Sequence, residues 1–352
     1  MFGRKGSKTG NYAFASAKVK AKKASLMGDD AYAKMLMMSL PEISRFIGES
    51  GYQKEMEELA GRIEGIDLIE HATYKNMART FSEILHVMQG ELRYMVSSYL
   101  TKWDLWNLKT ILRGKLYGVD NEEIKEDLVP AGKLDGEMLE RLLSLESDKE
   151  IIAEFGKFEH LEVPPEVMNT YKADGHLRSI EDYFDKLYYK KLLMSIDPSS
   201  RPTRIFQDYV RKEIDVVNLE TILVLKMEGI RGDDVMEYVI PGGKQIDKKL
   251  ATQLANAETI AAAANDLAQL DFYEDIKEAL DAGTGSLKDL VAGMRKYHMR
   301  QAKKFSHLYP LSVIPVLDYM IHKTNEVNNI RTIARGIESG IDRDTIKGLL
   351  VI

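Results

Sequence analysis

One helical phrase occurs three times in this chain, and its spacing constrains the fold more than any other feature. Residues 104–119 read DLWNLKTILRGKLYGV, residues 215–230 read DVVNLETILVLKMEGI, and residues 326–341 read EVNNIRTIARGIESGI. Copies one and two are identical at 8 of 16 positions and copies one and three at 6, where unrelated stretches would share roughly one. The copies begin 111 residues apart. The chain is therefore a threefold tandem repeat.

Each copy has the pattern of an amphipathic helix with a defined end. In the first copy, apolar residues at 105, 108, 111, 112 and 116 recur at helical spacing, which predicts one buried stripe. Gly118, Gly229 and Gly340 are each followed by Val or Ile, the pattern of a left-handed glycine just past a helix end. A second, short helix is expected to follow each of them.

The residue that opens each copy is acidic. Asp104 and Asp215 are predicted to cap the helix N-terminus, where a carboxylate accepts free backbone amides and favours the positive end of the helix dipole. Glu326 is a poorer cap, and Asn325 beside it is the alternative.

The repeat length divides the chain almost evenly. Three units of 111 residues leave a leader of about 19 out of 352 residues, which predicts boundaries at 1–19, 20–130, 131–241 and 242–352. With 44% hydrophobic residues, the chain can build one sizeable core or three smaller ones. The absence of cysteine and of an apolar leader favours the cytoplasm.

The expected fold class is all-α. Long helical runs precede the three motifs, at 67–102, at 180–214 with a break at 197–202, and at 289–323 with breaks at Pro310 and Pro315. A further helix is expected from Tyr52 to Ile66, with its end near Gly65. Loop chemistry is confined to 162–175 and 283–285.

Motifs that carry chemistry are almost absent from the sequence. The chain has no phosphate-binding loop of the form GxxxxGK[ST], and its seven histidines include no pair at i, i+4. No pair of catalytic carboxylates can be selected from the scattered acids. We expect no catalytic residue, no metal, no cofactor and no small-molecule substrate.

A polar band on the motif helices is the one candidate site. Asn107 and Thr110 share one helix face, and the face recurs in the other copies. The simpler interpretation is that these residues bond to a neighbouring helix within their own unit. The functional interpretation is that the three faces line a shared axis and meet a partner, which gives the candidates Asn107, Thr110, Arg113, Asn218, Thr221, Asn329, Thr332 and Arg335.

Two basic segments remain. Residues 1–28 hold seven Lys or Arg and no acid, which fits either a solvated helix end or a contact with an acidic partner or anionic headgroups. A second basic run at 295–304 is compatible with RNA, but the net charge of −6 argues against nucleic acid as a partner.

The first motif and its surroundings resemble a known family. Residues 99–115, YLTKWDLWNLKTILRGK, with 12–21, YAFASAKVKA, and 328–336, NNIRTIARG, resemble the C subunit of archaeal A-type ATP synthases, a relative of the d subunit of vacuolar ATPases. The resemblance therefore spans the whole chain.

The resemblance implies a funnel of three helical units around a pseudo-threefold axis, without catalytic residues. It implies a central-rotor subunit of a proton- or sodium-translocating complex, held at the cytoplasmic face of the membrane, with the proteolipid ring and the central shaft as partners. Val224, Leu225 and Ile337 depart from the family's basic motif end. A helical-repeat scaffold unrelated to rotary ATPases is the alternative.

Overall fold

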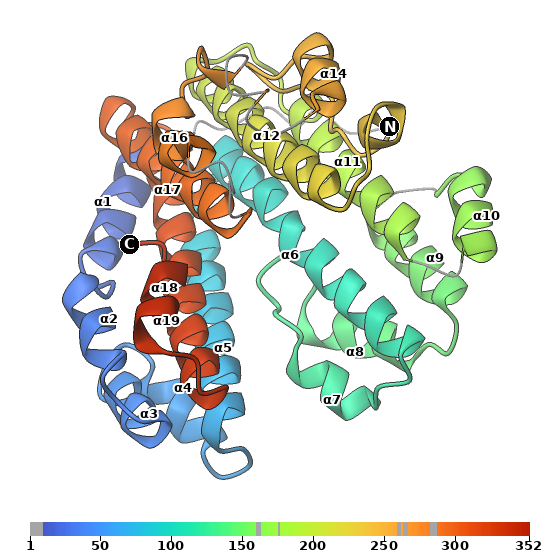
Figure 1. The fold of residues 1–352 in the computed structure, drawn as a ribbon. Helices are drawn as coiled ribbons and strands as arrows, with labels where there is room; N and C mark the ends of the chain where they lie inside the picture. The colour runs from blue at the N-terminus through green and yellow to red at the C-terminus, as the bar shows by residue number, and fades with distance from the viewer. Residues whose placement is uncertain (1–9, 160–162, 175–176, 259–261, 263–266, 282–286) are drawn as a thin grey trace. The chain divides into compact units, whose positions relative to one another are not determined.

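The computed structural model describes residues 10–159, 163–174, 177–258, 262, 267–281 and 287–352. Every regular element in these ranges is a helix, so the all-α prediction is confirmed (Figure 1). The helices are α1 Tyr12–Lys23, α2 Asp29–Met35, α3 Leu40–Gly48, α4 Gln53–Leu59, α5 Gly65–His86, α6 Gly90–Leu116, α7 Asn121–Glu126, α8 Gly136–Ser144, α9 Asp148–Glu159, α10 Pro165–Asp174, α11 Arg178–Met194, α12 Arg201–Met227, α13 Asp233–Met236, α14 Lys248–Asn256, α16 Tyr273–Asp281, α17 Leu287–Leu308, α18 Ile314–Glu338 and α19 Arg343–Leu349.

The helices form two compact units. One contains residues 44–188, and the other combines residues 11–43 with residues 189–352. The N-terminal helices α1 and α2 therefore fold with the C-terminal half of the chain. The predicted boundaries of the three repeat units stay predictions.

In the unit of residues 44–188, α6 is the central helix and packs against α5, α7, α8 and α9. Its core uses aromatic contacts, because large flat side chains bury much apolar surface. Phe155 and Phe184 meet edge to face with ring centroids 5.6 Å apart. The Tyr188 hydroxyl donates to the backbone carbonyl of Tyr99 over 2.8 Å.

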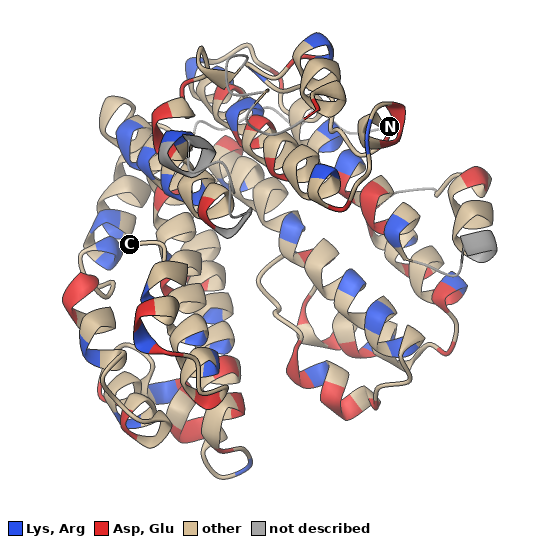
Figure 2. Ribbon diagram, viewed as in Figure 1, with Lys and Arg blue, Asp and Glu red and all other residues tan. Residues whose placement is uncertain are grey.

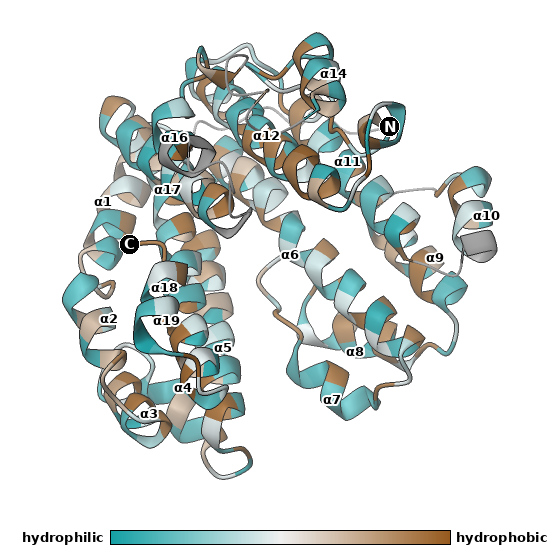
Figure 3. Ribbon diagram, in the orientation of Figure 1, coloured by the Kyte–Doolittle hydropathy of each residue, from teal (hydrophilic) through white to brown (hydrophobic). Residues whose placement is uncertain are grey.

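In the other unit, α17 packs against α12, α16 and α18, and α18 also contacts α1, α2 and α19. Figure 3 shows hydrophobic residues recurring along α12 between hydrophilic ones. Leu219, Ile222 and Leu223 of α12 join Phe272 and Tyr297 in one buried cluster, as an amphipathic helix requires.

The ends of the motif helices match the prediction. Gly118, Gly229 and Gly340 have φ of 69°, 84° and 66°, a left-handed conformation that is unfavourable for a residue with a side chain. In the first copy the Val119 amide donates to the Gly114 carbonyl over 2.9 Å. The same contact recurs from Ile230 to Leu225 and from Ile341 to Gly336, both at 2.9 Å. All three helices therefore end in the same Schellman motif.

Several predicted boundaries were wrong. Gly65 begins α5, because its φ of 65° breaks the chain before that helix. The long run 67–102 is interrupted at 87–89, so the first motif continues α6 without a break. The predicted loop 162–175 contains α10, whose first residue is Pro165, a position where the missing proline N–H has no helical partner to lose. The loop expected at 283–285 lies outside the described residues.

Candidate functional site

The three motifs form the C-terminal halves of the long helices α6, α12 and α18. The prediction that Asp104 and Asp215, and in the third copy Glu326 or Asn325, cap helix N-termini was wrong. Each of them lies inside its helix, and the N-cap residues are Gln89, Ser200 and Val313. All three acids are buried, at 0%, 1% and 3% exposure. A buried carboxylate requires hydrogen-bond donors from elsewhere in the chain.

For the first two acids, the donors are backbone amides of the segment that follows each predicted repeat unit. Asp104 accepts from the amides of Lys133 and Leu134, both at 2.9 Å. Asp215 accepts from Gln245 and Ile246, also at 2.9 Å. Burial raises the pKa of Asp104 to about 7, although the two backbone donors act in the opposite direction. Burial likewise raises the pKa of Asp215.

Two glycines make room for these carboxylates. A Cβ atom at Gly132 would collide with the carboxylate of Asp104, and one at Gly243 would collide with that of Asp215. This explains why the segments at 129–133 and 240–244 each hold a glycine at this position. The backbone has to approach the acid closely, and only glycine permits that approach.

In the third copy the donor comes from the other end of the chain. Glu326 accepts from the amide of Met27 over 2.5 Å. Leu134, Ile246 and Met27 occupy equivalent positions, since each directly precedes the N-cap residue of a helix, namely Asp135 of α8, Asp247 of α14 and Gly28 of α2. Thus α2 has the same place after the third motif that α8 and α14 have after the first and second.

Further contacts join the N-terminal segment to α18. The Lys23 ammonium donates to both carboxylate oxygens of Asp318, at 2.7 and 2.8 Å. Lys323 lies 2.8 Å from Glu326 and is itself only 7% exposed in its side chain. The acid of the third copy is therefore held by a cation and a backbone amide together.

The three candidate asparagines make one repeated contact. Asn107 donates to the Val129 carbonyl over 2.8 Å and accepts from the Val129 amide over 2.7 Å. Asn218 contacts Ile240 at the same two distances, and Asn329 contacts Val351 at 3.0 and 3.1 Å. All three side chains are buried. Each asparagine therefore holds the segment 22 residues further on, at the end of its own predicted repeat unit.

The other candidates lie nearer the surface. Thr110, Thr221 and Thr332 are half-buried, whereas Arg113 and Arg335 are exposed. The Arg113 guanidinium binds both carboxylate oxygens of Glu181 on α11, at 2.6 and 2.7 Å. A role of these five residues and the asparagines toward a partner stays a prediction.

Close packing of the short helices explains the residue that varies between copies. A Cβ at Gly114 would lie 2.5 Å from Ile124 of α7, and one at Gly336 would lie 2.5 Å from Ile346 of α19. The second copy has Leu225 at this position and the smaller Val235 of α13 at the position of Ile124, and both belong to one buried cluster. The change at 225 is therefore matched within its own unit.

Sequence reasoning missed the role of the acids, although a signal was present. Asp104, Asp215 and Glu326 each lie three residues before an asparagine of the motif, and residues at i and i+3 share a helix face. An acid and an amide on one face, at the same spacing three times, indicate one bound segment rather than a helix start.

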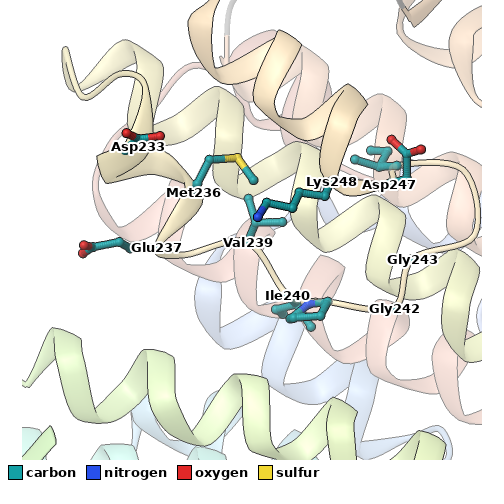
Figure 4. A pocket seen from close by; sticks show the side chains of 11 residues that line it. Asp233, Met236, Glu237, Val239, Ile240, Gly242, Gly243, Asp247 and Lys248 are labelled. Carbon is teal, nitrogen blue, oxygen red and sulfur yellow. The ribbon is translucent and has the colours of Figure 1, made fainter. Parts of the chain in front are cut away.

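A surface pocket of 630 Å³ lies beside the second copy's segment (Figure 4). Its wall consists of α13, the segment 239–243 and the start of α14. Asp233, Glu237 and Asp247 provide acids at its rim, and Lys248 extends across it toward Val239. The lining contains no histidine, serine or cysteine, so it offers no nucleophile with a neighbouring base.

Among the described residues, no group of three or more His, Cys, Asp or Glu is arranged to hold a metal ion. Within the same ranges, none of the helices combines the length and the apolar character needed to cross a membrane.

Comparison with known proteins now gives the class. Residues 15–349 match the model of the ATP synthase (C/AC39) subunit family. The chain is 36% identical to the C subunit of the A-type ATP synthase of Methanococcoides burtonii, over 97% of this chain and 94% of that protein. It is 35% identical to the C subunit from Methanosarcina acetivorans, over 98% and 94% of the two chains, and 32% identical to that from Archaeoglobus fulgidus, over 97% and 96%.

The chain belongs to the ATP synthase C/AC39 subunit family. It is a subunit of a rotary ATPase rather than a separate enzyme, which confirms the predicted class and excludes the unrelated scaffold. Its partners are other subunits of such a complex.

Proposed function

We propose that this subunit is a non-catalytic part of the central rotor and couples the central shaft to the membrane proteolipid ring. In this proposal it lies at the cytoplasmic face of the membrane, held there through its partners, in a complex that moves protons or sodium ions. The three repeat units close around one axis, along which the shaft enters.

The observation that carries the proposal is the hydrogen bond from the Met27 amide to the carboxylate of Glu326 in the third copy. Asp104 holds the start of the unit after the first motif, Asp215 holds the start of the next, and Glu326 holds Met27, near the start of the chain. With the predicted boundaries after residues 130 and 241, each acid holds the start of the following repeat unit and the last acid holds the first unit, a series that favours cyclic over open repetition. An open solenoid would leave the acid of its last repeat without a following unit.

Closure can be tested by distances in the free protein. Tyr117, Glu228 and Ser339 are the exposed C-cap residues of the three motif helices, and the chain has no native cysteine. Spin labels on cysteines at these positions can be measured in pairs. Three similar distances are expected, whereas a 117-to-339 distance near the sum of the other two would show an open arrangement.

The rotor role needs a separate experiment. The tagged native protein should co-purify with both the shaft and the proteolipid ring, in the absence of the catalytic subunits. Recovery with neither of them would refute the coupling role, and recovery with only one would refute the bridge between them.

A further inference from the structure

Two turns that each connect a pair of helices meet at one end of the unit that contains residues 189–352. They are the turn 195–200, between α11 and α12, and the turn 309–313, between α17 and α18. The guanidinium carbon of Arg201 lies 5.9 Å from the centre of the Tyr309 ring. This contact places the two turns side by side.

The first turns of α1 reach the same end. Two contacts pair α1 and its extension with α18, from Lys23 to Asp318 and from Met27 to Glu326, so both segments run in the same direction. At 1.5 Å per residue, the start of α1 lies roughly 16 Å before Lys23, whereas α18 begins only about 6 Å before Asp318. Helix α1, drawn beside α18 in Figure 1, therefore extends past the start of α18.

Large apolar side chains are exposed at this end. Phe14 is 56% exposed, Met194 75%, Leu308 57% and Leu311 64%. The corresponding turn of the first copy, 87–89, differs, since Met88 there is 2% exposed. The exposure is thus a property of this end and is not shared by the equivalent turn between helices in the first copy.

Cations surround these apolar side chains. Lys303 and Lys304 lie on α17 one turn before Leu308, and Lys18 and Lys20 lie on α1 beyond Phe14 by one to two turns. Figure 2 shows lysine and arginine gathered along α17. Lys303 and Lys304 are exposed and have no ion pair within 4 Å among the residues that the structure describes. The charge of Lys304 acts, after the hydrogen bond from Lys212, to lower the pKa of Asp271. The turn 195–200 also contains the exposed Asp197, and the four lysines outnumber this acid.

We propose that this end, defined by Phe14, Met194, Leu308, Leu311, Lys18, Lys20, Lys303 and Lys304, rests on anionic lipid headgroups. Apolar side chains that project from three separate segments need no shaped groove in a lipid interface, which accepts them at any spacing. The adjacent lysines then reach the phosphates, and each one near an anionic surface contributes about 1 kcal/mol. An acidic protein would match the lysines but would have to provide a separate apolar site for each segment. The lipid contact does not depend on the proposed rotor function.

The test is flotation of the purified full chain with vesicles of phosphatidylcholine alone and of phosphatidylcholine mixed with phosphatidylglycerol. Binding to the mixed vesicles only, and weaker binding at high salt, is expected. The double variant K303Q and K304Q should bind them roughly 30-fold more weakly, since each lysine accounts for about a fivefold factor. The double variant L308S and L311S should lose about tenfold or more through its smaller apolar burial.

Matched controls use exposed residues of the other unit. K149Q with K157Q removes two cations from α9, and Y117S removes an aromatic ring that is 79% exposed; both should bind like the unchanged chain. Equal binding to neutral vesicles, or equal losses in the controls, would overturn the proposal. A chain that floats with neither kind of vesicle would also overturn the proposal. This holds even if Lys303 and Lys304 are then found to govern capture of an acidic partner subunit.

Discussion

Replacing the three motif asparagines by alanine should destabilise the chain by unequal amounts, because the structure gives their backbone partners unequal support. In N218A, the amide and the carbonyl of Ile240 both lose the side chain that bonds them, at a site of 4% exposure. Neither group has another hydrogen bond among the residues that the structure describes. A buried polar group left unpaired costs about 1–3 kcal/mol, so two such groups cost roughly 2–6 kcal/mol.

N107A and N329A should each cost less. The carbonyl of Val129 also accepts from the Ala131 amide over 2.7 Å, and the carbonyl of Val351 also accepts from the Asn325 side chain over 2.7 Å. Each substitution therefore leaves only one N–H unpaired, at about 1–3 kcal/mol. Removing Asn325 together with Asn329 should raise the cost toward that of N218A.

Urea unfolding with an unchanged m-value measures these free energies. N256A is the matched control, because its exposed amide group only donates to the Thr252 carbonyl of its own helix, and it should remain within about 0.5 kcal/mol of the unchanged chain. The expected order is refuted if N218A unfolds like the control, or if N107A and N329A each cost as much as N218A.

Three further outcomes follow from the same contacts. G132A and G243A should each destabilise by about 1–3 kcal/mol in thermal unfolding, since a methyl group would push the backbone away from Asp104 or Asp215; G136A, where a Cβ meets nothing within 4 Å, is the control. Valine at Gly118, Gly229 or Gly340 should cost at least about 1–2 kcal/mol per site, and unchanged melting at all three would contradict the shared helix end. Because the pKa of Asp104 is raised from 3.8 to about 7, the native state keeps a proton that the unfolded chain loses, so the contribution of this group to stability falls as pH rises through that window, by up to about 1.4 kcal/mol per pH unit; D104N should flatten this slope, and an unchanged slope would count against the raised pKa.

Features set by local chemistry were predictable from the sequence. The all-α class and the left-handed glycines follow from periodicity and from the conformational preference of glycine. The predicted break at 197–202 was also correct, because Pro198 and Pro202 flank the N-cap Ser200 there.

Features set by distant partners were not predictable in this way. Asp104 has the local pattern of an N-cap, yet its donors at 133 and 134 lie in another element. The first long run at 67–102 contains no proline, and its break at 87–89 precedes Gly90, whose φ is 56°. Likewise, the sequence of Glu326 does not reveal that its donor is Met27, because 299 residues separate them.

The contact between Glu326 and Met27 also shows how the third repeat obtains the backbone donor that the first two repeats take from the segment following them. The first two acids take their donors from the segments before α8 and α14, whereas the third takes its donor from the segment before α2. Glutamate reaches one methylene further than aspartate, and this longer side chain accompanies the change of donor. The cation beside it changes too: Lys323 binds Glu326, whereas the equivalent Thr101 is neutral and the equivalent Lys212 binds Asp271 over 2.7 Å.

A contact between two segments that are far apart in the sequence can open without stretching a short connecting loop. The first and second acids hold segments that follow their own helices within about 30 residues along the chain, so the backbone itself limits their separation. The third acid has no such short tether, since 299 residues lie between it and its donor. If the three repeat units close around a shaft, the contact between Glu326 and Met27 is the junction that the backbone constrains least.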